Sequence, residues 1–312
     1  MFNLTESFEM ITPCFCAGAD QSYAEVRAPS IRGELRWWFR VLGGTPEQER
    51  SVFGGVHGEV KASKVVVRVS QVKEVHGNKA DLPQNMGAPL YYLFHWVKAA
   101  QKDPQNKVTA GFRYESMAWL APGTEFTVAI SSRFPLETRE QELLERAWKA
   151  FRLLGSIGLR HTRGLGAFAP KASVARSEVM DLLAGLRKAG VIAAVLSDAE
   201  EEITFFKDWK SALTVLANGL KRLRKEPDFS GKNPSSPLGA ASTHQASALY
   251  LRPVKVADGY VPVVFYAEKI LGSRALAVAE RAKAQVAGKL AAGSVIPYHE
   301  VDAETERYLL IK

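Results

Sequence analysis

Residues 27–40 have the sequence RAPSIRGELRWWFR, which combines a helix pattern with a row of arginines. At 100° per residue, the apolar side chains of this stretch and the residues just after it fall in one arc: Ile31, Leu35, Trp38, Phe39 and Leu42. The spacing predicts an amphipathic helix over about residues 30–43. Ser30 is its expected N-cap, Pro29 fixes the entry, and the first backbone N–H groups are left open to an anion.

The polar face of this helix carries arginines spaced four residues apart, flanked by a tryptophan and preceded by one more arginine: Arg32, Arg36, Arg40, Trp37 and Arg27. Glu34 is the one acid that interrupts the row. Gly33 costs helix stability but lets another backbone approach closely. Such a face is either solvated or holds a nucleic acid backbone. Both interpretations stay open at this point.

Bulk properties favour a two-domain protein with a polyanionic partner. The chain has 312 residues, 46% of them apolar, with a net charge of +8 and a pI near 9.4. Cys14 and Cys16 are expected to be small buried residues in a reducing compartment, with neither a disulfide nor a zinc site between them. No signal peptide and no membrane-length apolar run is found, so a cytoplasmic protein without metal or cofactor is expected.

The first half of the chain reads as an α+β unit. Alternation and helical spacing predict, in chain order, a strand over 2–16, the arginine helix, strands over 63–69, 91–97 and 124–131, a helix over 138–156, and a strand over 170–176. Strand, helix, strands, helix, strand is the ferredoxin-like order of RNA-recognition motifs. A ferredoxin-like domain is therefore predicted for residues 1–176.

The second half is interpreted as a degenerate copy of the same unit, over residues 177–312. The predicted elements are a strand near 202–206, a helix over 208–224, a long loop over 226–247, strands over 249–256 and 261–267, and an alanine-rich helix over 272–292. The helix over 208–224 ends in the cations of residues 221–225. These either compensate the helix dipole or bind an anion.

A glycine-rich loop after the long helix is a second candidate binding element. Basic side chains precede two glycines there, and no acid occurs from residue 159 to 177: Arg160, His161, Arg163, Gly164 and Gly166. Successive N–H groups around such glycines form an anion nest, or the glycines simply cap the helix and turn the chain. A third acid-free region, residues 229–257, contains Arg252 and either follows a phosphate backbone or is a solvated linker.

The sequence contains few arrangements of residues that are typical of a catalytic site. His161 is placed either as a general base for RNA cleavage or as a residue that stacks on a base or donates to phosphate. Asp20 is a candidate carboxylate, but a turn residue is the commoner outcome after Gly18. These patterns indicate a protein that binds rather than cuts.

Residues 12–20 and 27–40 together resemble the N-terminal signature of the family of first Cmr subunits. These belong to the repeat-associated mysterious protein (RAMP) superfamily of type III-B CRISPR systems. Shorter segments are similar to other parts of the same family: Val52-Phe53-Gly54 with Gly58 to its phenylalanine-glycine loop, Arg163-Gly164-Leu165-Gly166 to its glycine-rich loop, and residues 246–253 to a second-domain segment in which Ala248 stands where proline is expected.

The resemblance implies two ferredoxin-like, RRM-like RAMP domains packed in tandem. It also implies a non-catalytic subunit that binds the guide (CRISPR) RNA near its 3′ end and helps capture target RNA, beside other Cmr subunits and away from any membrane. The alternative is a RAMP-type endoribonuclease that uses His161 or Asp20. The expected RNA-binding residues come from three segments: Arg27, Ser30, Arg32, Gly33, Arg36, Trp37 and Arg40; Arg160, His161, Arg163, Gly164 and Gly166; and Arg252.

Overall fold

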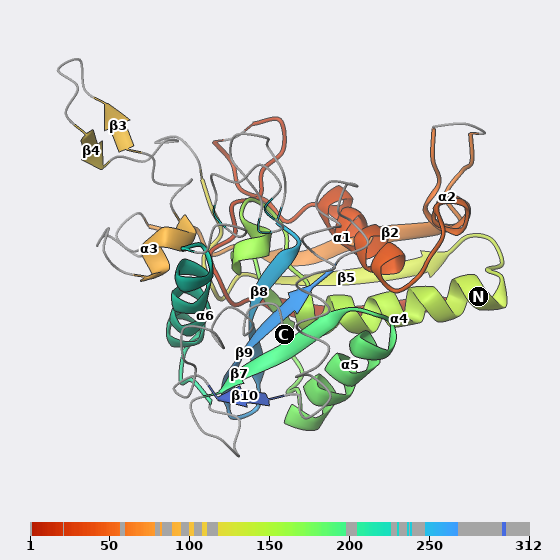
Figure 1. Ribbon diagram of the computed structural model, residues 1–312. Coiled ribbons are helices and arrows are strands. Elements are labelled where there is room, and N and C mark those ends of the chain that lie inside the picture. Colours follow the sequence, from red (N-terminus) through yellow and green to blue (C-terminus); the bar gives the residue numbers. More distant parts are fainter. Residues whose placement is uncertain are drawn as a thin grey trace.

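The chain folds around two four-stranded sheets, each with helices packed on it (Figure 1). The computed structural model describes residues 2–20, 22–56, 60–78, 82, 89–94, 100–102, 108–110, 118–197, 205–225, 230, 236, 238, 247–267 and 295–297. Within these ranges, no helix has the length and apolar composition needed to cross a membrane.

The first sheet has the strand order β2-β5-β1-β6, and its paired neighbours are antiparallel. Its strands are β1 (Asn3–Met10), β2 (Val65–Lys73), β5 (Glu125–Ser132) and β6 (Phe168–Pro170). Helix α1 (Ala28–Val41) follows β1, and helix α4 (Thr138–Leu154) follows β5. Two helices in these places give the ferredoxin-like topology.

An aromatic core fixes α1 and α4 on one face of this sheet. Phe8 of β1 is fully buried, and its ring centroid lies 5.6 Å from those of Phe126 and Phe151. Trp38 and Phe39 of α1 are also fully buried. Complete burial of such rings is the largest apolar contribution that single side chains make, about 2–3 kcal/mol each. The apolar arc of the arginine helix therefore faces the core, as its spacing predicts.

The second sheet repeats the strand order of the first, read from the other edge, with the order β10-β7-β9-β8. Its strands are β7 (Ile192–Ser197), β8 (Leu249–Val256), β9 (Gly259–Tyr266) and β10 (Val295–Pro297), with α5 (Arg176–Lys188) before β7 and α6 (Trp209–Leu223) after it. The β10–β7 pair is parallel, unlike the other pairs. The expected fold class, two ferredoxin-like domains in tandem, is confirmed.

Five shorter elements complete the described chain: α2 (Pro46–Phe53), α3 (Pro89–Phe94), β3 (Ala100–Lys102), β4 (Val108–Ala110) and the 3-10 turn η2 (His161–Arg163). Helix α3 packs beside α6 (Figure 1). η2 contacts β8 and thus joins the glycine-rich loop to the second sheet. Both contacts become important for the candidate site.

Most regular elements lie where the sequence predicts them. Strands are confirmed over 63–69, 124–131, 249–256 and 261–267, and helices over 138–156 and 208–224, with shifts of a few residues at their ends. The strand over 2–16 stops at Met10, and Cys14 makes only an isolated bridge to Leu120. The strand over 170–176 is the short β6 instead. Both cysteines are free and buried, as expected.

The prediction of a strand over 91–97 is wrong for the part of this segment that the structure describes. Residues Pro89–Phe94 form α3, whose buried side chains include Leu93 and Phe94. Aromatic residues favour strands only where they pack on a sheet, and packing against α6 overrides that preference here. The sequence also left α2, α5 and β7 unassigned. The division at 176/177 falls at the start of α5 and stays a prediction.

Several expectations concern residues outside the described ranges. The alanine-rich helix over 272–292 and Gly58 lie there entirely, as does most of the loop over 226–247. Of the strand near 202–206, only Phe205 and Phe206 are described, and Phe206 forms a single bridge with Tyr260.

Gly166 is expected to be irreplaceable for folding. Its φ is +63°, and an added Cβ would lie 1.8 Å from the carbonyl oxygen of Ile157. We expect Gly166→Ala to lower the free energy of unfolding by about 2–4 kcal/mol, because backbone must move to admit the methyl group. Gly185 in α5 has open space at its Cβ, so Gly185→Ala should stabilise by about 0.5–1 kcal/mol. Urea unfolding of both variants checks this, and equal effects would contradict it.

Candidate nucleic-acid interface

Helix α1 begins earlier than its sequence suggests. Arg27, with extended backbone angles, precedes the first turn, so Ser30 lies inside that turn and is not the N-cap. Pro29 fits there because the first N–H groups of a helix have no intrahelical acceptor. The hydroxyl of Ser30 lies 3.5 Å from the Cys16 thiol, and the Arg27 guanidinium lies 3.1 Å from Glu25. Neither side chain points to an open N-terminal site.

The arginines of α1 contact helix α2, a partner that sequence reasoning missed. Arg36 Nε lies 2.6 Å from Glu49 Oε1, and Arg40 Nη1 lies 3.0 Å from the same oxygen. Arg32 donates to the carbonyl of Phe53 at the end of α2. Two guanidinium groups thus share one carboxylate, and a third bonds to a neutral carbonyl, which leaves a net positive charge on this face. No local pattern could have paired residues 9 and 13 positions apart on separate helices.

Gly33 lies on the same face of α1 as Arg36 and Arg40, since residues three and seven positions apart on a helix are neighbours. Gly33 is exposed, and nothing lies within 4 Å of the place where its Cβ would be. The side chains of Arg36 and Arg40 are 34% and 44% exposed. The outer surface of α1 is therefore basic and open at its centre.

Trp37 turns away from this surface toward the second domain. Its ring centroid lies 4.6 Å from that of Tyr250 on β8 and 4.7 Å from that of Trp38. Tyr250 stacks in turn on Phe265 of β9. The indole of Trp37 was expected to lie beside the arginines, but it packs between α1 and the second sheet. Burying an aromatic ring is more favourable in free energy than leaving it in water.

The glycine-rich loop is shaped by left-handed backbone and by close packing. Arg160 and Gly164 have φ values of +63° and +83° on either side of η2. The Gly166 N–H donates to the carbonyl of Pro13, and a Cβ on Gly164 would collide with Leu213 of α6. The loop is thus wedged between the two domains. The alternative interpretation, that the glycines only cap a helix and turn the chain, does not account for these contacts.

Two of the predicted binding arginines lie inside the protein. Arg163 is 4% exposed and donates to the carbonyl of Leu238 at 2.7 Å. Arg252 is 1% exposed and belongs to β8, within the strand predicted over 249–256, so its side chain lies in the interior and not on an exposed polar segment. It donates to the carbonyls of Leu154 and His161. Burial lowers the pKa of both guanidinium groups, to about 9 and about 10.

His161 lies between the loop and β8. Its Nδ1 is 3.2 Å from the carbonyl oxygen of Gly158, and its ring centroid is 6.1 Å from that of Tyr250. Burial, with the nearby charge of Arg252, lowers the pKa of His161 to about 4. The imidazole is consequently neutral at pH 7. Such a weak base is poorly matched to proton abstraction at neutral pH.

Asp20 is exposed in a turn, where its Oδ1 accepts hydrogen bonds from the backbone N–H and the hydroxyl of Ser22. These bonds lower the pKa of the carboxyl group. Asp20 therefore has the geometry of an ordinary turn residue. Among the described residues, no group of three or more His, Cys, Asp or Glu side chains is placed to hold a metal ion.

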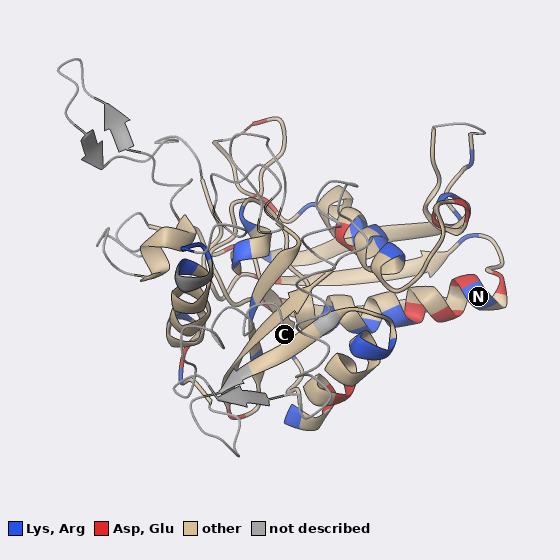
Figure 2. Ribbon diagram, in the orientation of Figure 1, with Lys and Arg blue, Asp and Glu red and all other residues tan. Residues whose placement is uncertain are grey.

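Glu34 links α1 to the buried arginine of β8. It is 8% exposed, and burial raises its pKa to about 7, against the opposing influence of Arg252. Figure 2 shows the basic residues of α1 and η2 on opposite sides of β8, where these contacts meet. The two basic segments predicted from sequence are thus brought together around one strand.

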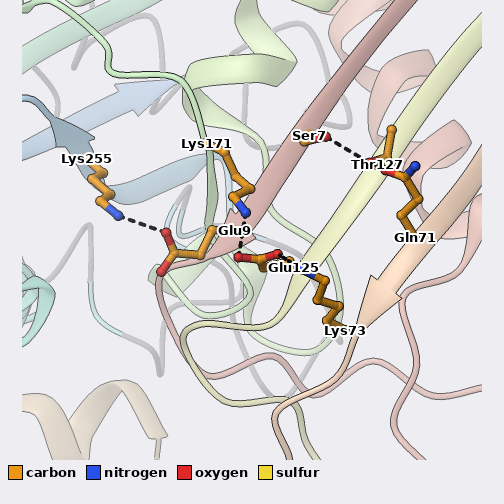
Figure 3. A network of polar contacts seen from close by, with 8 residues as sticks. All are labelled: Ser7, Glu9, Gln71, Lys73, Glu125, Thr127, Lys171 and Lys255. Atoms are coloured by element: carbon orange, nitrogen blue, oxygen red, sulfur yellow. Dashed lines mark hydrogen bonds and ion pairs between the residues drawn. The ribbon is translucent and has the colours of Figure 1, made fainter.

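The outer face of the first sheet differs from a base-stacking platform. Side chains that point away from α1 and α4 include Ser7, Glu9, Glu125 and Thr127, and a polar network joins them (Figure 3). Lys171 and Lys73 lie 2.6 Å and 3.1 Å from Glu125. At the outward positions of β1 and β5, all of which are described, no aromatic side chain is present. Stacking of bases requires such rings.

Comparison with known proteins connects this architecture to a family. Residues 7–169 match the RAMP superfamily. The chain belongs to this superfamily. The match spans the first sheet, α1, α4 and the glycine-rich loop, the elements around which the candidate interface is built. The resemblance to the family of first Cmr subunits agrees with the relatives that follow.

Two curated relatives come from Pyrococcus furiosus. CRISPR system Cmr subunit Cmr1-2 is 26% identical over 183 residues, 54% of this chain and 94% of that protein. Cmr subunit Cmr1-1 is 30% identical over 170 residues, 52% of this chain and 44% of that protein. This chain therefore matches about half the length of the second relative.

Solved structures agree with the fold. The crystal structure of apo Cmr1 from Pyrococcus furiosus aligns with a TM-score of 0.55 at 20% identity, over 85% of this chain and 88% of that one. A chain in a type III-B Cmr-beta structure bound to cognate target RNA aligns with a TM-score of 0.51 at 11% identity, over 84% and 94%. At such identities the likeness shows a shared fold.

The opposite pKa shifts of Glu34 and His161 predict opposing effects of pH on stability. Between pH 4.5 and 7 the folded state holds more protons at Glu34 than the unfolded state, so this group makes stability fall as pH rises. Between pH 4 and 6.5 the folded state holds fewer protons at His161 than the unfolded state, so this group makes stability rise with pH.

Single variants should separate the two effects. Glu34→Gln leaves only the effect of His161, so we expect its free energy of unfolding to rise by about 2–3 kcal/mol from pH 4.5 to 6.5. His161→Asn leaves only the effect of Glu34, so its free energy of unfolding should fall by a similar amount, whereas that of the wild type should stay nearly flat. Chemical unfolding at stepped pH measures this. Slopes of the same sign in both variants would contradict the assignment.

Proposed function

We propose that this chain is an RNA-binding, non-catalytic subunit of a type III-B Cmr effector complex. In this role it binds the guide RNA near its 3′ end and helps capture target RNA, with other Cmr subunits as neighbours in the cytoplasm. Support comes from relatives named as Cmr subunits and from a similar chain in a complex bound to cognate target RNA. Two free cysteines suit a reducing compartment.

The observation that carries the proposal is the charge balance on the outer face of α1. Glu49 is the acid that the structure places between Arg36 and Arg40, and both guanidinium groups stay partly exposed. A phosphate backbone can approach at Gly33, where the helix surface is open. Bidentate guanidinium contacts suit phosphate oxygens, and neighbouring arginines one helical turn apart can follow successive phosphates.

Binding is favoured over cleavage by the state of the two candidate catalytic groups. Burial and the charge of Arg252 lower the pKa of His161 and keep it neutral at pH 7, and Asp20 accepts hydrogen bonds from Ser22. The alternative, a RAMP-type endoribonuclease acting through either residue, requires a proton acceptor placed at an RNA site. Incubation of the protein with labelled guide and target RNAs, with and without Mg²⁺, distinguishes the two: cleavage that disappears in His161→Ala would favour the enzyme.

Removal of the exposed arginines should weaken RNA binding. We expect Arg36→Gln with Arg40→Gln to lower affinity for single-stranded RNA at least tenfold at fixed salt, and to reduce the slope of log affinity against log salt by about 1.4, since each lost phosphate contact contributes about 0.7. Fluorescence anisotropy over a salt series measures both.

The matched control is Arg139→Gln with Lys149→Gln, which removes two exposed charges from α4. Its affinity should stay within about twofold of the wild type, apart from weak long-range screening effects. An equal loss in both double variants would show that only net charge matters and would contradict a site on α1.

A bulky residue at position 33 should block the same face without touching the arginines. We expect Gly33→Leu to fold normally, because the space around it is open, and to bind RNA several-fold more weakly. Gly185→Leu on α5, another open helical position, is the control. Unchanged RNA affinity in a folded Gly33→Leu protein would remove α1 from the interface.

A further inference from the structure

Helix α2 supplies one buried carboxylate to the basic face of α1. The side chain of Glu49 is 7% exposed, whereas those of Arg36 and Arg40 are 34% and 44% exposed. Glu49 Oε1 accepts from Arg36 Nε at 2.6 Å and from Arg40 Nη1 at 3.0 Å, and Oε2 accepts from the same Arg40 nitrogen at 3.1 Å. The carboxylate therefore lies beneath the two guanidinium groups, and a ligand that arrives from water meets the arginines first.

The position of Glu49 is fixed by contacts that do not involve these two arginines. Helix α2 begins with a capping box, in which the side chains of Thr45 and Gln48 each accept a hydrogen bond from the backbone N–H of the other residue. At the other end of α2, Phe53 is fully buried, and its ring centroid lies 5.6 Å from that of Phe39 on α1. A carboxylate on a helix restrained at both ends limits where its two partners can lie.

The geometry of the pairing leaves both arginines able to bind a ligand. Arg36 uses only its Nε and Arg40 only its Nη1, and the remaining N–H groups of both side chains bond to no other residue that the structure describes. Because both groups share the oxygen Oε1, they are held side by side. Two cations so placed repel each other unless an anion lies between them, and Glu49 supplies that anion.

We infer that Glu49 is a positioning residue for RNA binding, which holds the guanidinium groups of Arg36 and Arg40 side by side with their remaining N–H groups free to bond to phosphate. The inference rests on the proposed function, because it concerns the same face of α1. An arginine already held in place loses less conformational entropy when RNA binds, an advantage of about two- to tenfold in affinity for each side chain. Charge alone predicts the opposite effect, since an acid near the RNA repels its phosphates.

The opposite signs of these two effects make Glu49→Gln an informative variant. Gln keeps the length of the side chain and removes the charge that holds the two cations. We expect its affinity for single-stranded RNA to be about fivefold lower than that of the wild type at fixed salt, measured by fluorescence anisotropy. Affinity equal to or above that of the wild type in folded Glu49→Gln would overturn the inference.

The matched control is Glu47→Gln, which removes the same charge from an exposed position in the first turn of α2. Its RNA affinity should be unchanged or should rise by up to about threefold, because only repulsion is removed. A loss as large as that of Glu49→Gln would show that any change in α2 weakens binding and would also overturn the inference.

A second variant, Glu49→Asp, keeps the net charge and shortens the side chain by one methylene group. If reach decides the effect, it should bind RNA at least about twofold more weakly, whereas an effect of charge alone predicts no change. This variant decides the question if Glu49→Gln does not fold, which urea unfolding shows. Wild-type affinity in Glu49→Asp would then overturn the positioning role.

A double-mutant cycle distinguishes positioning from damage to the fold. In the Arg36→Gln, Arg40→Gln background, the side chains that Glu49 holds are gone, so Glu49→Gln should no longer weaken RNA binding. A purely structural role of Glu49 would lower affinity by the same factor in both backgrounds and would overturn the inference.

The same measurements separate this inference from the proposed function. If Arg36→Gln with Arg40→Gln leaves RNA affinity unchanged, α1 is not the RNA-binding face, and both proposals are overturned. If that double variant binds weakly while Glu49→Gln and Glu49→Asp bind like the wild type, α1 remains the interface and only the positioning role of Glu49 is overturned.

Discussion

The buried guanidinium of Arg252 is the interaction on which the arrangement of the two domains depends. From β8 it donates to the carbonyls of Leu154, at the end of α4, and of His161 in the glycine-rich loop. A cation is stabilised at a helix C-terminus, and its burial requires that each of these acceptors stay in place. Glu34 adds a partial counter-charge from α1. One side chain of the second domain thereby fixes three elements of the first.

This constraint divides the basic residues of the chain by what each one contacts. Arg252 donates to backbone carbonyls of the first domain and holds the domains together. Arg36 and Arg40 are partly exposed and are restrained by Glu49 of α2. Arg163 lies between these extremes, buried yet with an Nη1 that bonds to no described residue. Net charge alone would have given all of them the same role.

The sequence predicted what local periodicity can encode. The apolar arc through Leu35 and Trp38 placed α1 on the core, and alternation located β5 and β9, because burial repeats every 3.6 or two residues. The pairing of Arg36 with Glu49 and the convergence of Arg163 with Arg224 on the carbonyl of Leu238 join residues whose separation follows no such period. Every residue has a backbone carbonyl, so the residue type of the acceptor does not reveal that a guanidinium bonds to it. Arg252 could therefore be recognised from the sequence as basic but not as buried.

The two basic regions of the chain differ in their exposure to water. Exposed arginines on α1 interact through water, so their attraction is weakened by salt and depends little on which phosphate is nearby. Arg163 is buried, whereas Arg160 and Arg224 are half-buried, so electrostatic interactions act more strongly at Arg163 than on the exposed face of α1.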